Sequence, residues 1–156
     1  MRSALIHYRL ALLIGAAAVL AIAAAFVLQY AGGLQPCHLC ILERWPYVAA
    51  AAIAFIGAAA SKPRLALVLV AVAMATGTLL AAYHVGVEEG LFTLPASCIA
   101  GQEAQTIDDL RAQLMTAAPT CDQVKAVWLG LSLASWNALL ALGLTLLALI
   151  GALKTS

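Results

Sequence analysis

Residues 10–28 read LALLIGAAAVLAIAAAFVL, nineteen positions without a single charge. A helix rises 1.5 Å per residue, so about 20 apolar residues cross the roughly 30 Å hydrocarbon core of a bilayer. Three further apolar runs follow, at about 45–60, 65–83 and 133–153. The sequence therefore predicts an all-α membrane protein: a bundle of four transmembrane helices that forms one integral membrane domain over residues 1–156.

The composition of the chain points the same way. Of its 156 residues, 65% are hydrophobic and only 10% are charged, whereas an ordinary soluble domain has roughly 45–50% apolar and about 25% charged residues. A water-soluble globule of this size could not bury so much apolar surface. The formal net charge of +1 also provides no basic surface for a phosphate backbone. These values exclude a soluble enzyme, a disordered chain and a nucleic-acid-binding protein.

The distribution of basic residues predicts the side of the membrane on which each segment lies. Both termini and the turn at 61–64 fall on one side, which holds five basic residues and no acidic ones: Arg2, Arg9, Lys62, Arg64 and Lys154. The other side holds three basic and all seven acidic residues. Because lysine and arginine concentrate in cytoplasmic segments, we expect cytoplasmic termini and two outer loops, at about 31–44 and 84–128. In a bacterium, this predicts an inner-membrane protein with both loops in the periplasm.

All four cysteines fall in these outer loops. Cys37 and Cys40 lie directly before the second span, which fixes them at the membrane surface. Cys98 and Cys121 lie in the longer second loop, and we expect this pair to be mobile and to face water. Between them, residues 107–115 have apolar positions at helical spacing, which predicts a short amphipathic helix, either on the membrane surface or packed on the loop's own core. The periplasm is oxidising, so disulfides can form there.

The short first loop also brings a cation close to its cysteines. If the second helix begins near Cys37, then Cys37, Cys40 and Arg44 share one helix face through their i, i+3 and i, i+4 spacing. A helix N-terminus and a nearby positive charge both favour the thiolate, the reactive form of cysteine. Arg44 is therefore a candidate functional residue, although a side chain that extends its charge to the membrane surface has the same position. We interpret His38 as a variable spacer.

Four cysteines in this arrangement fit three uses. Two disulfides could staple the loops, but a staple explains Cys37 with Cys40 poorly, because closing so short a loop removes little chain entropy. A zinc site of four cysteines usually consists of two close pairs, whereas 22 residues separate Cys98 from Cys121. Thiol–disulfide exchange linked to a membrane oxidant explains both pairs. One pair faces water, and the other lies within reach of a lipid-soluble electron acceptor.

The sequence around the first pair resembles a known family signature. Residues 36–44 read PCHLCILER, which is similar to the P-C-x-L-C-x-x-E-R signature of the DsbB family of bacterial disulfide-bond-forming membrane proteins. Four spans, inward termini and a second cysteine pair in the long outer loop are similar as well. The resemblance implies a membrane oxidoreductase that re-oxidises a DsbA-like periplasmic thiol oxidase and passes two electrons to ubiquinone or menaquinone.

The resemblance also implies a role for each cysteine. Cys98 forms the mixed disulfide with the partner protein, and Cys121 is its companion in the loop disulfide. Cys37 exchanges with the loop pair, and Cys40 is the thiolate that faces the quinone ring.

Two further residues are implied as quinone contacts. Arg44 stabilises the Cys40 thiolate and polarises a quinone oxygen. His84 resembles a family histidine near the quinone, although an ordinary interfacial histidine could occupy the same place at the end of the third span. The exchange needs no metal ion. The alternative function is a non-enzymatic membrane or assembly protein whose disulfides only staple its loops.

Overall fold

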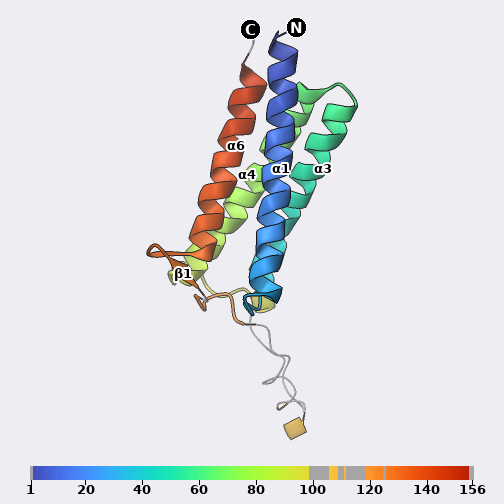
Figure 1. Cartoon of the computed structure of the whole chain (residues 1–156). Helices are drawn as coiled ribbons and strands as arrows, with labels where there is room; N and C mark the ends of the chain where they lie inside the picture. Colours follow the sequence, from blue (N-terminus) through green and yellow to red (C-terminus); the bar gives the residue numbers. More distant parts are fainter. Residues whose placement is uncertain (1, 99–105, 109–110, 112–118, 125, 155–156) are drawn as a thin grey trace.

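A computed structural model describes residues 2–98, 106–108, 111, 119–124 and 126–154 of the chain. Four long helices run side by side (Figure 1): α1 (Arg2–Tyr30), α3 (Arg44–Ala59), α4 (Pro63–Glu88) and α6 (Leu133–Leu153). A short helix, α2 (His38–Leu42), leads into α3, so that the two form one apolar segment. Each of these four segments is long and apolar enough to cross a membrane. The predicted all-α, four-helix membrane fold is confirmed.

The two ends of the bundle carry different parts of the chain. Both termini and the turn between α3 and α4 lie at one end (Figure 1), which we call the terminal end. There the Arg64 Nε donates a hydrogen bond to the Ala152 carbonyl oxygen at 3.0 Å, which joins the start of α4 to the end of α6. The loop before α2, the end of α4 and the start of α6 lie at the opposite end, the cysteine end.

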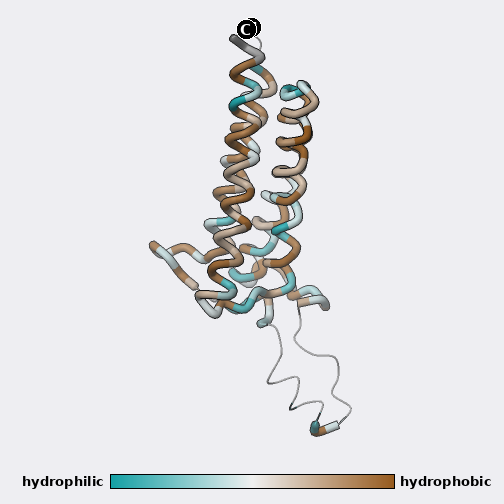
Figure 2. The backbone as a smooth tube through the Cα atoms, turned by 45° about the vertical axis from the view of Figure 1, so that its right-hand side comes forward, coloured by the Kyte–Doolittle hydropathy of each residue, from teal (hydrophilic) through white to brown (hydrophobic). Residues whose placement is uncertain are grey.

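Small side chains form most of the contact surface between the helices. Gly57 of α3 packs so closely on α4 that a Cβ atom at this position would lie 2.3 Å from the Cβ of Ala66. Larger core residues are fewer, and Leu67, Val70 and Met74 of α4 are among the largest that are fully buried. Small residues allow close packing where lipid provides no hydrophobic drive for helix association. Many large apolar side chains are exposed along the four long helices instead, as expected of lipid-facing surfaces. Figure 2 shows that hydrophobic residues predominate along these helices.

The third spanning helix is longer than the sequence predicts. Hydropathy indicates an end near residue 83, but α4 continues to Glu88. The continuation keeps a buried face, because His84, Gly86 and Val87 all point inward. His84 therefore lies inside the last turns of a helix rather than in the loop that follows.

The segment directly before α6 is a short hairpin. Strands β1 (Val127–Trp128) and β2 (Leu131–Ser132) pair in antiparallel fashion. Leu129 and Gly130 both have positive φ angles, 52° and 81°, as the tightest hairpin turns require. The amphipathic helix expected at 107–115 lies largely outside the described residues.

Candidate functional site

The first cysteine pair lies where the second spanning segment begins. Cys37 is the N-cap residue of α2, and its Sγ accepts a hydrogen bond from the Cys40 backbone N at 3.2 Å. One helical turn brings the two Sγ atoms to 2.6 Å from each other without a bond between them. This separation is about half an ångström longer than a disulfide bond. The pair is therefore placed for disulfide closure, with Cys37 buried and Cys40 partly buried.

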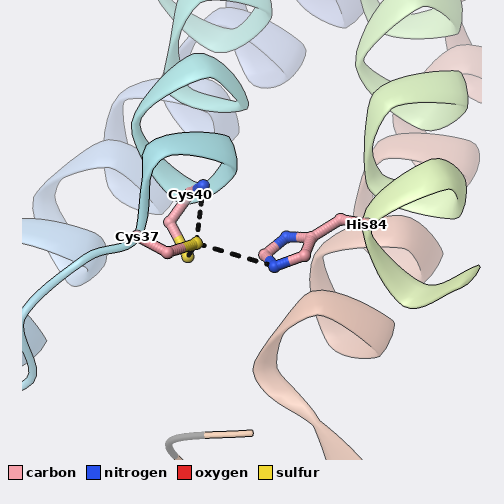
Figure 3. A group of neighbouring side chains, drawn as sticks. All are labelled: Cys37, Cys40 and His84. Atoms are coloured by element: carbon pink, nitrogen blue, oxygen red, sulfur yellow. Dashed lines mark hydrogen bonds between the residues drawn. The ribbon is translucent and has the colours of Figure 1, made fainter. Parts of the chain in front are cut away.

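His84 approaches this pair from α4 (Figure 3). Its Nε2 lies 3.6 Å from the Cys37 Sγ, and its Nδ1 lies 2.7 Å from the Glu43 Oε1. All three residues are buried. Sequence reasoning associates His84 with an electron acceptor, and the structure additionally shows it in contact with a cysteine. The start of α2 and the end of α4 thus meet at the Cys37 sulfur, and Glu43 at the junction of α2 with α3 holds the other nitrogen of the imidazole.

These contacts make Cys37 an acidic thiol. Its pKa is lowered from 9.0 to about 4. The hydrogen bond from the Cys40 side chain contributes most, burial acts in the opposite direction, and the His84 imidazole adds to the lowering. The His84 Nε2 and the Cys40 backbone N–H both lie at the Cys37 Sγ and favour negative charge on this sulfur, whereas the resemblance implies a thiolate on Cys40.

We expect the alkylation rate of Cys37 by iodoacetamide to stay almost constant between about pH 5.5 and 8. Because its pKa is lowered, the thiolate is present above about pH 4 and is lost only as the pH falls through that value. While the pH is below its pKa, an ordinary thiol reacts about tenfold faster for each unit by which the pH rises. The measurement is the modification rate in the full-length protein, with the peptide identified by mass spectrometry and the denatured protein as control. A tenfold rise per unit would show that Cys37 is an ordinary thiol.

The second cysteine pair is closed and lies against the first. Cys98 and Cys121 form a disulfide with a Cα–Cα distance of 5.3 Å, which is the pairing that the resemblance implies. Cys98 is only 3% exposed and Cys121 is 0% exposed, and both pack in one apolar cluster with Cys37, Leu39 and Val87. The expectation that this pair faces water is therefore wrong for this conformation. The apolar contacts of the cluster hold the two pairs together.

Arg44 lies on the opposite side of the site, against α1. Its Nη1 donates a hydrogen bond to the Gln29 Oε1 at 2.9 Å, and its guanidinium carbon lies 4.9 Å from the centroid of the Phe26 ring. The sequence predicts this cation beside Cys40. In the structure both residues line the same cavity, but the hydrogen bond of Arg44 goes to α1. Sequence reasoning does not identify Gln29 or Phe26, because helical spacing within residues 37–44 carries no information about α1.

A buried carboxylate connects the site to α6. Glu43 is 6% exposed, and its Oε2 accepts a hydrogen bond from the Asn137 Nδ2 at 2.6 Å. The Tyr47 hydroxyl in turn donates to the Asn137 Oδ1 at 2.6 Å. Burial of a charge is costly unless hydrogen bonds compensate it, and these partners provide that compensation. The sequence does display an acid next to one span and an asparagine within another, but it does not reveal that they meet.

An apolar cavity of about 490 Å³ lies beside the first cysteine pair. Alanine and leucine side chains of α1 and α6 form much of its wall, and its polar lining includes Cys40, Arg44, His84 and Asn137. Small-molecule sites are of this size and consist of apolar walls with a few placed polar groups. The lining fits a quinone: the apolar wall suits its ring and tail, Arg44 and His84 can hold its oxygens, and a cysteine lies within the same cavity.

The site also contains a set of potential metal ligands. Among the described residues, Cys37, Cys40 and His84 each offer a donor atom, all within 4.8 Å of one another. Two thiolates on one tetrahedral zinc ion, each at about 2.3 Å from the metal, lie about 3.8 Å apart. The Sγ atoms of Cys37 and Cys40 are 2.6 Å apart. The geometry of the pair therefore favours sulfur–sulfur chemistry over metal binding.

The comparison with known proteins agrees with this geometry. The family model described as "Disulfide bond formation protein DsbB" matches residues 7–151, a range that includes all four cysteines. No curated protein sequence matches the chain. Since the family match extends over nearly all of the 156 residues, the chain belongs to the DsbB family of disulfide bond formation proteins.

Proposed function

We propose that this protein is a membrane thiol–disulfide oxidoreductase that re-oxidises a DsbA-like periplasmic dithiol protein and passes the electrons to ubiquinone or menaquinone. One observation carries the proposal: a free and a closed cysteine pair share one buried cluster beside an apolar cavity. The closed loop pair is suited to a protein donor. The cavity is suited to a lipid-soluble acceptor.

The proposal includes an orientation in the bacterial inner membrane. The terminal end, which holds the basic turn at 61–64, faces the cytoplasm. The cysteine end faces the periplasm, where the oxidising environment suits disulfide exchange. The location of both cysteine pairs at one end of the bundle supports this orientation, because both can then act in the same compartment.

The first exchange takes electrons from the partner protein. A partner thiolate attacks Cys98, which forms a mixed disulfide and releases Cys121 as a thiolate. The second partner thiol, as a thiolate, then attacks the partner's own sulfur in the mixed disulfide. The partner leaves with a closed disulfide, and both loop cysteines are reduced. Because Cys98 is buried in the cluster, the loop must move away from α2 before this attack can occur.

The second exchange moves the electron pair to the membrane surface and begins with Cys37 and Cys40 joined in a disulfide. A reduced loop cysteine attacks Cys37, and Cys40 leaves as a thiolate, the species that the resemblance implies. The other loop cysteine then displaces Cys37, which closes the loop disulfide. The products are a closed loop pair and a reduced Cys37 and Cys40, the same bonding state that the structure shows.

The last step returns Cys37 and Cys40 to a disulfide. The quinone supplies, when bound, an acceptor for two electrons and two protons. The His84 Nε2 can hold the proton that Cys37 releases, because it lies 3.6 Å from the Cys37 Sγ. Arg44 places a fixed positive charge on the cavity wall, where low dielectric strengthens its effect on developing negative charge. The apolar wall excludes water from the sulfur atoms.

The proposal is tested with the purified full-length protein and a soluble quinone analogue. We expect reduction of the analogue only when a reduced DsbA-like protein is supplied, with the partner disulfide forming in equal amount. The same partner with alkylated thiols is the control. A protein whose disulfides merely staple its loops would leave both reagents unchanged, and that result would establish the non-enzymatic alternative.

A further inference from the structure

A continuous chain of hydrogen bonds crosses the bundle at the cysteine end. It runs from the Tyr47 hydroxyl through the Asn137 side chain to Glu43, and from there to His84 and Cys37. The simplest role for such a chain is to tie α6 to α3, as polar groups between membrane helices do. Two features of the geometry go beyond that role: the donors on the two carboxylate oxygens, and the direction of the histidine ring.

Both oxygens of the Glu43 carboxylate are held, and each is held by a different helix. Oε1 lies 2.7 Å from the His84 Nδ1 of α4, and Oε2 accepts the Asn137 Nδ2 of α6 at 2.6 Å. The amide of Asn137 is itself oriented, because its Oδ1 accepts the Tyr47 hydroxyl and its Nδ2 must therefore face the carboxylate. The carboxylate thus has one defined orientation between two donors.

We propose that Asn137 is a positioning residue for the cysteine site: it fixes the Glu43 carboxylate so that the His84 Nδ1 carries the ring proton and the Nε2 faces the Cys37 sulfur. The inference deepens the proposed function. Only the expected effect on turnover rests on that function, whereas the effect on the thiolate does not. The hydrogen bonds of the Asn137 side chain go to Glu43 and Tyr47, so its action on the cysteines passes through Glu43.

The chemistry follows from what each group can donate. An ionised carboxylate only accepts hydrogen bonds, so the His84 Nδ1 must be the donor in this contact. In a neutral imidazole the other nitrogen, Nε2, then has a free lone pair. The Cys37 S–H bond can break with its proton transferred to that lone pair, which leaves a thiolate beside an imidazolium and moves no electrons between residues. A carboxylate that holds a histidine in one tautomer has this effect in other catalytic sites.

The test compares Asn137→Leu with the unaltered full-length protein. Leucine has the same branched arrangement of side-chain heavy atoms as asparagine but gives the Glu43 Oε2 no donor. We expect a smaller ultraviolet thiolate absorbance from the reduced Cys37 and Cys40 pair when it is measured at about pH 4, close to the pKa of Cys37. We also expect kcat for quinone-analogue reduction to fall about 10- to 100-fold, the usual cost of losing such an outer partner.

Thr145→Val is the matched control. Thr145 is a buried polar residue of the same helix whose Oγ1 lies 3.3 Å from the Thr78 Oγ1 of α4, about 12 Å further along α6 than Asn137. A purely structural role of interhelical hydrogen bonds predicts similar effects for both variants. We expect the control to keep both the thiolate absorbance and kcat.

Tyr47→Phe provides a second, milder test, because it removes only the hydroxyl that orients the Asn137 amide. We expect a smaller loss of thiolate absorbance in the same direction. A folded Asn137→Leu variant with full thiolate absorbance and full kcat overturns the proposal, and if that variant does not fold, full absorbance in Tyr47→Phe overturns it. The absorbance measurement uses neither partner nor quinone. A wild-type protein that fails to reduce quinone would therefore contradict the proposed function without deciding this inference.

Discussion

Replacing Cys40 with serine is expected to abolish quinone reduction by a reduced partner protein, with a loss of more than about 1,000-fold in kcat. A serine hydroxyl cannot form a disulfide with Cys37, so the first pair can no longer accept or release two electrons. The loss should be complete because the Cys40 Sγ, 2.6 Å away, is the sulfur with which Cys37 closes a disulfide in the proposed mechanism. The measurement is the initial rate of quinone-analogue reduction by the full-length variant.

His38→Ser is the matched control for this change. His38 lies between the two cysteines in the same helix, but its side chain is exposed and points away from the buried cluster. We expect a rate close to that of the unaltered protein, in agreement with its interpretation as a spacer. If Cys40→Ser retained substantial turnover, the first pair would lie off the path of the electrons and the proposed mechanism would be wrong.

The spanning helices can be predicted from the sequence because each depends on the length and polarity of its own segment. A bilayer imposes one length and one polarity on every segment that crosses it, so the apolar run at 10–28 already indicates a spanning helix without reference to any other part of the chain. The end of α4 is the instructive exception. Hydropathy falls after residue 83, but His84 and Glu88 remain helical because a buried face continues through Val87.

The contacts of the site depend on residues that are distant in the sequence. Glu43 and Asn137 are 94 positions apart, and Cys37 and His84 are 47 apart. Each residue is conspicuous as a polar group at the edge of an apolar run, which is costly in a membrane and therefore points to function. Periodicity along one helix does not show which of these groups meet. Arg44 demonstrates the same limit, because its spacing from Cys40 is correct but its hydrogen bond goes to another helix.

In the second loop, the length of the segment predicts a cysteine pair that faces water, but packing buries this pair. A long connection between membrane helices is expected to extend into water. In the structure, its disulfide instead lies in a cluster with Leu39 and Val87, because these apolar side chains at the membrane surface gain from being covered. The consequence is functional: the two cysteine pairs are brought together, while access from solution to the loop pair is restricted.

Replacing Cys98 with alanine is expected to eliminate the mixed disulfide between this protein and its partner. The adduct is trapped with a partner that retains only its attacking cysteine, and it is measured on a non-reducing gel. In the unaltered protein, mass spectrometry of the adduct should find the partner joined to Cys98 and not to Cys121. Ser97→Ala is the control, because this neighbour is exposed and contributes no sulfur, and it should leave the amount of adduct unchanged.

The structure gives a reason to expect attack at Cys98 in particular. Cys98 ends a short 3-10 helix whose other two residues, Ala96 and Ser97, are exposed, whereas Cys121 is completely enclosed. We therefore expect a displacement of this helix to uncover the Cys98 sulfur first, which makes Cys121 the leaving sulfur. An adduct mapped to Cys121 would reverse the two roles. An adduct that persists in Cys98→Ala and maps to Cys37 or Cys40 would mean that the partner bypasses the loop pair altogether.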